Sequence, residues 1–378
     1  MKKHHSTAII VMVVALAMAA IASKTFLEHR IEEPIVKGPG VGEIRKLSSW
    51  FPGLADTPGD TDVYIFKGAQ PGGSMMVLGG THPNEPAAYM AAVLLIENVS
   101  LSHGTLYVIP RANRSAFTHN DPQEGAPLDF HFKLADGSTR FFRYGSRATN
   151  PVHQWPDPDV YIHAASGQTL SGNETRNLNR GYPGRPDGTL TERVCFGIAE
   201  MIRAENIDIS IDLHEASPEY PVINAIVAHE RAMPVASSVV LGLEMFDINI
   251  GLEPSPRNLR GLTHRELGDA TDTLAVLMES ANPSQGRLRS KTDEALVLTG
   301  KDPYYVKAQA LGRLYVPFDE SGHPIEVRVG RHLTAINEFA FSLGLEYPDK
   351  PLEFENVPGY EELIAQGVGA YLRPVPSL

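Results

Sequence analysis

Short apolar runs alternate with helical patterns along most of the chain. Six runs have the length and apolar content of buried strands, and they cover residues 62–68, 74–80, 105–112, 208–215, 222–229 and 273–280. Apolar residues recur at helical spacing over four further segments, 83–98, 191–206, 229–246 and 331–345. Strands that are apolar on both faces are typical of a sheet covered by helices on each side. The pattern therefore predicts an α/β fold, a three-layer helix–sheet–helix sandwich with a mixed, mostly parallel central sheet.

The amino terminus has the layout of an export signal. Lys2 and Lys3 precede a uniformly apolar run over residues 8–22, and the run ends in a small-x-small cleavage site, Ala20-Ile21-Ala22. Because the run is shorter than the roughly 20 residues of a typical spanning helix, residues 1–23 are interpreted as a secretory signal peptide. An uncleaved anchor to the inner membrane through residues 8–22 is the alternative. Either way, we expect an extracytoplasmic protein, periplasmic or secreted.

The remainder of the chain divides into three parts. Residues 24–60 are rich in Pro and Gly and are interpreted as a linker and entry segment, 61–345 as the main domain, and 346–378 as a carboxy-terminal tail. Inside the main domain, residues 114–176 form a long polar stretch rich in Pro, Gly and Asn. Ordered stretches of that length without a regular pattern are uncommon unless they are functional, so we expect an insertion that forms one wall of a cleft.

Charge and cysteine content narrow the function. The net charge of −12 is opposite to the basic surface that binds nucleic-acid phosphates, so a nucleic-acid partner is not expected. The single cysteine, Cys195, excludes an intrachain disulfide and lies in a helical pattern, where a small buried apolar residue is the simplest interpretation.

Three polar side chains lie at the ends of predicted strands, where open α/β sheets bind their ligands. In "GGTHPNEP", His82 and Glu85 are three residues apart, and a helix opened by Pro83 would place both on one side of its first turn. His214 ends the strand "DISIDLHE". Two histidines and a carboxylate make the donor set of a catalytic zinc site, with one zinc per chain. Asp212, two residues before His214, leaves the same face of the strand and is expected to orient a ligand.

The remaining chemistry of an amide hydrolase also has candidates. Glu279 ends the apolar strand "TLAVLMES" and is expected to act as general base and acid for a water molecule activated by zinc. Arginine forks suit a substrate carboxylate or a polarised carbonyl. The candidates for these contacts are Arg111, Asn113, Arg114, Asn179 and Arg180.

Five motifs in order resemble the succinylglutamate desuccinylase/aspartoacylase branch of the zinc metallocarboxypeptidase superfamily. They are "GGTHPNE", "ANRSAF", "NLNRGYPG", "IDLHEAS" and "ESANPSQGRLR", and they span residues 79–289. The resemblance implies a zinc-carboxypeptidase-like fold, His82, Glu85 and His214 as metal ligands, and Glu279 as the catalytic glutamate. It implies substrate contacts for Asn179 and Arg180.

The chain departs from the motifs of that branch at three positions. Pro83 replaces a glycine, Asn177 replaces the aspartate of Asp-Leu-Asn-Arg, and Ser115 stands where aspartoacylases place an arginine that polarises the carbonyl. Arg111 and Arg114 are the candidates to replace that arginine.

We therefore expect an exported, zinc-dependent hydrolase that cleaves an amide bond of an N-acylated amino acid or a related small substrate with a carboxylate. Two alternatives stay open. One is a periplasmic zinc carboxypeptidase that acts on cell-wall or other peptides, and the other is a non-catalytic binding protein on the same fold.

Overall fold

A mixed sheet forms the centre of the protein. The computed structural model describes residues 2–121 and 125–376. Within them, nine strands form one sheet of order β1-β2-β4-β3-β9-β12-β10-β11, and the ninth strand, β13, pairs with β4. Four central strands, β4, β3, β9 and β12, run parallel, while the outer pairs β1–β2, β2–β4 and β12–β10 are antiparallel. The bounds are β1 (Val41–Lys46), β2 (Asp62–Lys67), β3 (Gln70–Leu78), β4 (Ser100–Ile109), β9 (Ile209–Ala216), β10 (Ala225–Ala228), β11 (Gly251–Pro254), β12 (Leu274–Ala281) and β13 (Glu353–Glu355).

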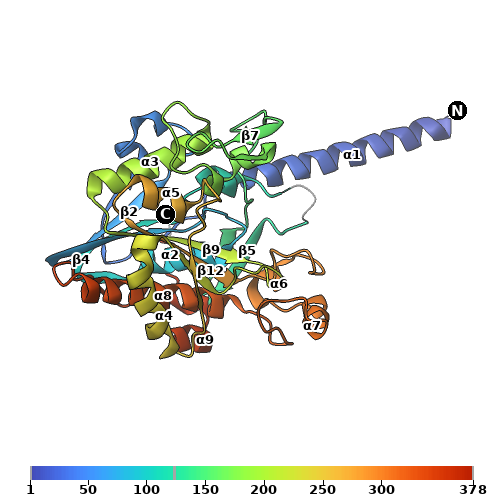
Figure 1. The fold of residues 1–378 in the computed structure, drawn as a ribbon. Helices are drawn as coiled ribbons and strands as arrows, with labels where there is room; N and C mark the ends of the chain where they lie inside the picture. The colour runs from blue at the N-terminus through green and yellow to red at the C-terminus, as the bar shows by residue number, and fades with distance from the viewer. Residues whose placement is uncertain (1, 122–124, 377–378) are drawn as a thin grey trace.

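Helices cover both faces of this sheet, as Figure 1 shows. One face carries α3 (Leu190–Glu205) and α5 (Thr263–Ala270), and the other carries α2 (Pro86–Asn98), α4 (Met233–Glu244) and α8 (Ile325–Glu346). Each face has its own apolar core. The predicted three-layer α/β sandwich with a mixed, mostly parallel sheet is confirmed.

All six predicted strands are present, whereas three of the helix boundaries were wrong. Helix α2 begins at Pro86 rather than at Pro83, because residues 82–85 close a turn in which the Glu85 N–H donates to the His82 carbonyl at 3.0 Å. Helix α4 begins at Met233 after a short 3₁₀ turn, and α8 begins six residues earlier than predicted, at Ile325.

The segments outside the core pattern also adopt regular structure. Residues 24–60 contribute β1, and the carboxy-terminal tail contributes β13 and α9 (Tyr360–Gln366) to the main body. The stretch 114–176 forms two hairpins, β5 (Asp129–Lys133) with β6 (Thr139–Arg143) and β7 (Val160–Ile162) with β8 (Thr169–Ser171). Two short helices, α6 (Glu294–Thr299) and α7 (Pro303–Ala310), form a lobe beside the carboxyl end of β12.

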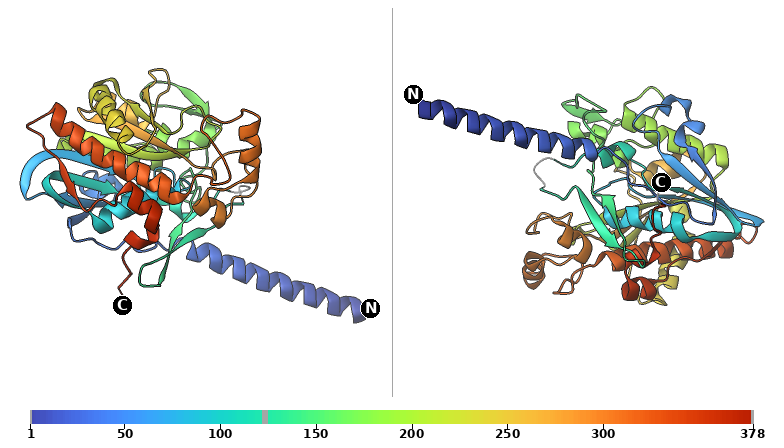
Figure 2. Two further views of the ribbon diagram at one scale, coloured as in Figure 1. Left: turned by 90° about the horizontal axis from the view of Figure 1, so that it is seen from below. Right: turned by 180° about the vertical axis from the view of Figure 1, so that it is seen from behind.

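The amino-terminal helix projects from the body. Helix α1 (Lys2–Glu28) contains a segment, His4–Glu28, that is long and apolar enough to cross a membrane and is not buried against the rest of the protein. Figures 1 and 2 show it extending away from the sheet layers. Its last turn is tied to β6, since the Arg143 guanidinium donates to the carbonyls of Glu28 and Ile31. A few residues later Glu33 is buried and accepts a hydrogen bond from the Tyr89 hydroxyl at 2.7 Å. The helix is thus consistent with a signal sequence or an anchor, and it joins the body without a free linker.

Candidate metal centre

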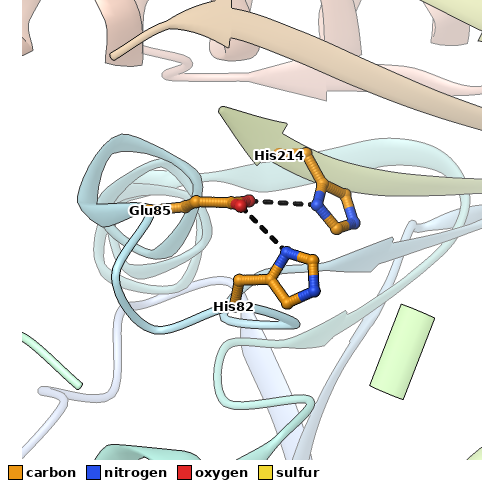
Figure 3. A group of neighbouring side chains, drawn as sticks. All are labelled: His82, Glu85 and His214. Atoms are coloured by element: carbon orange, nitrogen blue, oxygen red, sulfur yellow. Dashed lines mark hydrogen bonds and ion pairs between the residues drawn. The ribbon is translucent and has the colours of Figure 1, made fainter. Parts of the chain in front are cut away.

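Three potential metal ligands meet at the carboxyl ends of β3 and β9. His82 and Glu85 lie in the turn that follows β3, and His214 lies in β9, the strand next to β3. One donor atom from each residue lies within 4.8 Å of the others, and all three side chains are almost completely buried. Figure 3 shows both imidazole rings directed at the Glu85 carboxylate. The structure therefore brings the predicted ligand set together.

A tight turn makes this meeting possible. Gly80 has φ of +62°, and a Cβ atom there would lie 2.7 Å from the Phe117 ring and from the Pro110 carbonyl oxygen. A larger residue would therefore be strained and would clash. The chain then turns through 82–85, and α2 starts at Pro86, where proline's missing N–H is not needed. The two ligands thus lie in the turn before the helix, not on its first turn as predicted.

The outer nitrogen of each histidine is fixed by a hydrogen-bond acceptor. His82 Nε2 lies 2.8 Å from Asn177 Oδ1, and His214 Nε2 lies 2.8 Å from Asp212 Oδ2. Both oxygens can only accept, so each Nε2 carries the hydrogen. The inner atoms, both Nδ1, then point at Glu85, 2.8 Å and 3.0 Å from its two carboxylate oxygens. Two imidazole lone pairs and a carboxylate facing one point fit a zinc ion, and the outer acceptors are of the kind that orient zinc-bound histidines.

Asn177 is the partner of His82 that sequence reasoning did not identify. Its amide orientation is fixed, because Oδ1 also accepts from the Asn179 N–H at 3.0 Å while Nδ2 donates to Glu174 at 2.7 Å. The amide oxygen thus occupies the place beside His82 that Asp212 occupies beside His214. The predicted loss of a carboxylate at residue 177 leaves an acceptor in place, but a neutral one.

The protonation of the three residues reflects a buried negative charge. Burial opposes ionisation of Glu85, but His82 and His214 outweigh it and hold the Glu85 pKa below its usual range. Burial, reinforced by Arg147, lowers the pKa of His82 to about 4. Burial alone would also lower the pKa of His214, yet Asp212 and Glu85 together raise it well above its usual range. Asp212 and Glu85 thus favour positive charge at this point, and a divalent cation held by the two Nδ1 lone pairs would supply it.

Glu279 lies beside the triad on the neighbouring strand. Its Cα is the register partner of His214 across the β9–β12 ladder, and its side chain lines the same cavity. Its Oε2 atom is buried and makes no hydrogen bond to any residue that the structure describes. Burial raises the pKa of Glu279 to about 8, although the nearby His214 opposes this. A carboxyl group that holds or releases a proton near neutral pH suits general acid–base chemistry.

A cavity of about 620 Å³ opens over these four residues. Asn179 and Arg180, the candidates for substrate binding, line it, and Asn179 Oδ1 accepts from the Thr263 N–H at 2.8 Å. Arg147 lines it too, with Nη1 3.4 Å from Glu85 Oε1. Sequence reasoning missed Arg147, because "YGSRAT" in a polar insertion carries no recognisable motif. Two residues of the 114–176 stretch, Arg147 and Glu174, thus contribute to the cavity wall.

Three other candidate residues do not line this cavity. Arg111 is buried, donates to the Glu33 carbonyl at 2.6 Å and to the Tyr89 hydroxyl at 2.9 Å, and forms ion pairs with Glu32 and Glu33. Arg114 also pairs with Glu32. Asn113 caps a 3₁₀ turn by accepting from the Ala116 N–H. The two arginines hold the segment after β4 against residues 32–33, because the buried Glu33 needs a positive partner there.

Comparisons with known proteins found distant likeness among solved structures alone. No protein-family model and no curated protein matches the chain. Among solved structures, it is similar to a succinylglutamate desuccinylase from a Silicibacter species, with 16% identity, a TM-score of 0.36, and 60% of this chain aligned to 55% of that one. It is also similar to a metallo-carboxypeptidase from Burkholderia cenocepacia, with 12% identity, a TM-score of 0.46, and coverage of 85% and 68%. A product-bound cell shape determinant protein from Helicobacter pylori matches at 12% identity and a TM-score of 0.43, with coverage of 79% and 56%. The chain spans about half the length of the first of these structures.

Proposed function

We propose that the protein is an exported, zinc-dependent hydrolase, with one zinc per chain, that cleaves the amide bond of an N-acylated amino acid or a related small substrate. The observation that carries the proposal is the buried His82–Glu85–His214 triad with Glu279 in the same cavity. Buried carboxylates of this kind are retained where they bind metals or do chemistry. The apolar helix α1 supports export.

The residues of the site divide the work of hydrolysis. Bound zinc would polarise the amide carbonyl. It would also lower the pKa of water, so that water can lose a proton and act as the nucleophile near neutral pH. Glu279 takes a proton from the attacking water and returns it to the leaving nitrogen, which its raised pKa suits. Asp212 and Asn177 keep the two histidine rings in the tautomer that faces inward.

Two arginines handle negative charge in this mechanism. Arg147 lies beside the Glu85 carboxylate and stabilises the charge that develops on the carbonyl oxygen, the role for which Arg111 and Arg114 were candidates. Arg180 binds the substrate carboxylate. Asn179 positions the Arg180 side chain, since the backbone carbonyl of Asn179 accepts a hydrogen bond from Arg180 Nη1 at 2.6 Å.

A zinc carboxypeptidase is the second candidate. It is favoured by α1, because an exported enzyme encounters peptides, and by a cavity that is larger than a single amino acid needs. The same catalytic residues would serve. The two candidates differ in whether an acyl acid or a peptide is released together with the amino acid.

Metal content tests the proposal first. Elemental mass spectrometry of the purified protein should give about one zinc per chain, and the His214→Ala variant should lose this zinc. His131→Ala, on the exposed β5 strand, is the matched control and should keep it. N-acetyl amino acids and short peptides then distinguish the deacylase from the carboxypeptidase. A folded wild-type protein that takes up no zinc would refute the hydrolase and favour a binding protein.

A further inference from the structure

One end of the catalytic cavity is apolar. Six of the lining side chains there are aliphatic or proline and come from β10, β12 and the segment 254–262, while Glu253 and His264, their neighbours in sequence, line the cavity too. The six are Val227, Leu277, Pro254, Pro256, Leu259 and Leu262. We define these six residues as the apolar subsite.

The three most buried members of the apolar subsite are not part of the protein's cores. Val227, Leu262 and Leu277 are each less than a tenth exposed, yet none belongs to an apolar core cluster of the described residues. Their sequence neighbours Val276 and Met278 do belong to one. Successive side chains of a strand point to opposite faces, so Val227 and Leu277 face the cavity while their neighbours fill the core. Apolar side chains that line a cavity without packing into a core indicate a place for an apolar ligand group.

The strand register places this subsite next to the reacting groups. Leu277 precedes Glu279 by two residues on β12, so the two side chains leave the same face about 7 Å apart. Val227 is the register partner of Leu277, and Asp212, which holds His214, is its partner on the other side. A side chain in the apolar subsite would therefore be attached within one or two bonds of the amide that is cut.

A carboxylate site adjoins the same end of the cavity. Gly261, at the end of the loop 254–262, has φ of +83° and packs so closely on Arg180 that a Cβ atom would lie 2.2 Å from the Arg180 carbonyl oxygen. The loop 254–262 is thus fixed against the backbone of Arg180, whose side chain lines the same cavity and is proposed to bind a carboxylate. A carboxylate and an apolar group bound at neighbouring places match the two substituents on the α-carbon of one amino acid.

Charge at this end opposes an acidic side chain. Glu253 lines the cavity and is the register partner of Val227, and Glu279 lies on the other side of the subsite. With Arg180 assigned to the substrate carboxylate, an aspartate or glutamate side chain in the apolar subsite would lie near two carboxylates on an apolar surface, which adds to the cost of burying its charge.

We propose that the amino acid held in the cavity has an apolar side chain of the size of leucine, methionine or phenylalanine, whichever acyl group or peptide is attached to its nitrogen. This inference rests on the proposed function and names the substrate class of that site.

The first test compares substrates that differ only in the side chain. The zinc-loaded protein should cleave N-acetyl-leucine with kcat/KM about 10- to 100-fold above that for N-acetyl-glycine, and above that for N-acetyl-aspartate. A preference for N-acetyl-aspartate would overturn the inference while leaving the proposed function intact. A preference for N-acetyl-lysine would also overturn it, and would assign recognition to Glu253.

Variants and a binding measurement separate the subsite from the chemistry. Leu259→Arg on the half-buried loop should lower the ratio of kcat/KM for N-acetyl-leucine to that for N-acetyl-aspartate by about 10-fold or more, whereas the exposed Leu241→Arg on α4 should leave it unchanged. Calorimetry with free L-leucine, L-aspartate and L-lysine gives an independent readout. If no amide is cleaved, the proposed function fails, and tighter binding of leucine than of the other two still decides the inference. Equal or weaker binding of leucine would overturn it.

Discussion

The neutral acceptor beside His82 leads to a testable prediction about zinc affinity. Asn177→Leu keeps the side-chain volume but removes three hydrogen bonds at 2.7–3.0 Å, from His82 and the Asn179 N–H and to Glu174. The buried His82 Nε2–H is left without a partner, which costs about 1–3 kcal/mol and removes the preference for the tautomer whose Nδ1 faces Glu85. Losing such an outer contact typically weakens metal binding 10- to 100-fold, or about 1.4–2.7 kcal/mol. We therefore expect the zinc dissociation constant to rise by that factor.

Competition with a chromophoric chelator of known affinity measures this dissociation constant. Asn173→Leu, an exposed position four residues earlier, is the matched control and should bind zinc like the wild type. Circular dichroism of the metal-free proteins checks that both variants fold. A zinc affinity of folded Asn177→Leu within twofold of the wild type would show that the contact to His82 does not set the metal site.

Four further predictions follow from the same structure. Glu279→Gln should keep its zinc but lose about 10²- to 10⁴-fold in kcat, measured on the best substrate, and near-normal turnover would remove Glu279 from the mechanism. Arg147→Met should lower kcat about 10²- to 10³-fold with a smaller change in KM, and a pure KM effect would assign Arg147 to substrate binding instead. Arg111→Met should destabilise the fold by about 3–5 kcal/mol in urea denaturation, because the buried Glu33 carboxylate loses its ion pair with Arg111, while zinc content stays normal. Loss of zinc without loss of stability would contradict this account. Burial lowers the pKa of His332 to about 3, below its unfolded value of about 6.5. Between these two values the unfolded chain binds a proton that the folded chain does not, so the free energy of unfolding falls as the pH drops below about 6.5. His332→Gln should therefore lose about 2 kcal/mol less than the wild type between pH 7 and pH 5, and equal losses would refute the assignment.

The apolar pattern predicted the sheet and the layers because burial on both faces of a strand leaves a direct mark on the sequence. The positions where helices begin were harder to predict from the sequence. "HPNEP" contains two prolines, and both suit a first helical position. The choice of Pro86 depends on the 82–85 turn, which follows Gly80, the residue packed against Phe117 and Pro110. Local sequence does not contain that contact.

The candidate site shows the same division. His82, Glu85, His214 and Glu279 lie near strand ends, where topology alone brings side chains together, and the structure places them in one cavity. Arg147 and Asn177 are brought there by the 114–176 stretch and by a 3₁₀ turn, whose paths no periodicity describes. Arg111 was an attractive candidate by residue type, yet the acidic groups of residues 32–33, nearly 80 positions away in sequence, hold it elsewhere.

The junction between α1 and the body would determine how the protein stands on a membrane surface. The Arg143 guanidinium donates to the Glu28 and Ile31 carbonyls, and Glu33 is buried just beyond. These contacts fix the end of α1 against β6. If α1 were embedded in a bilayer, these contacts would restrict the height and tilt of the body, and with them the distance of the cavity from the lipid. Cleavage after Ala22 would remove that restriction and leave the contacts of Glu28, Ile31 and Glu33 with the body intact, so the released protein would keep the same cavity and reach a wider range of ligands.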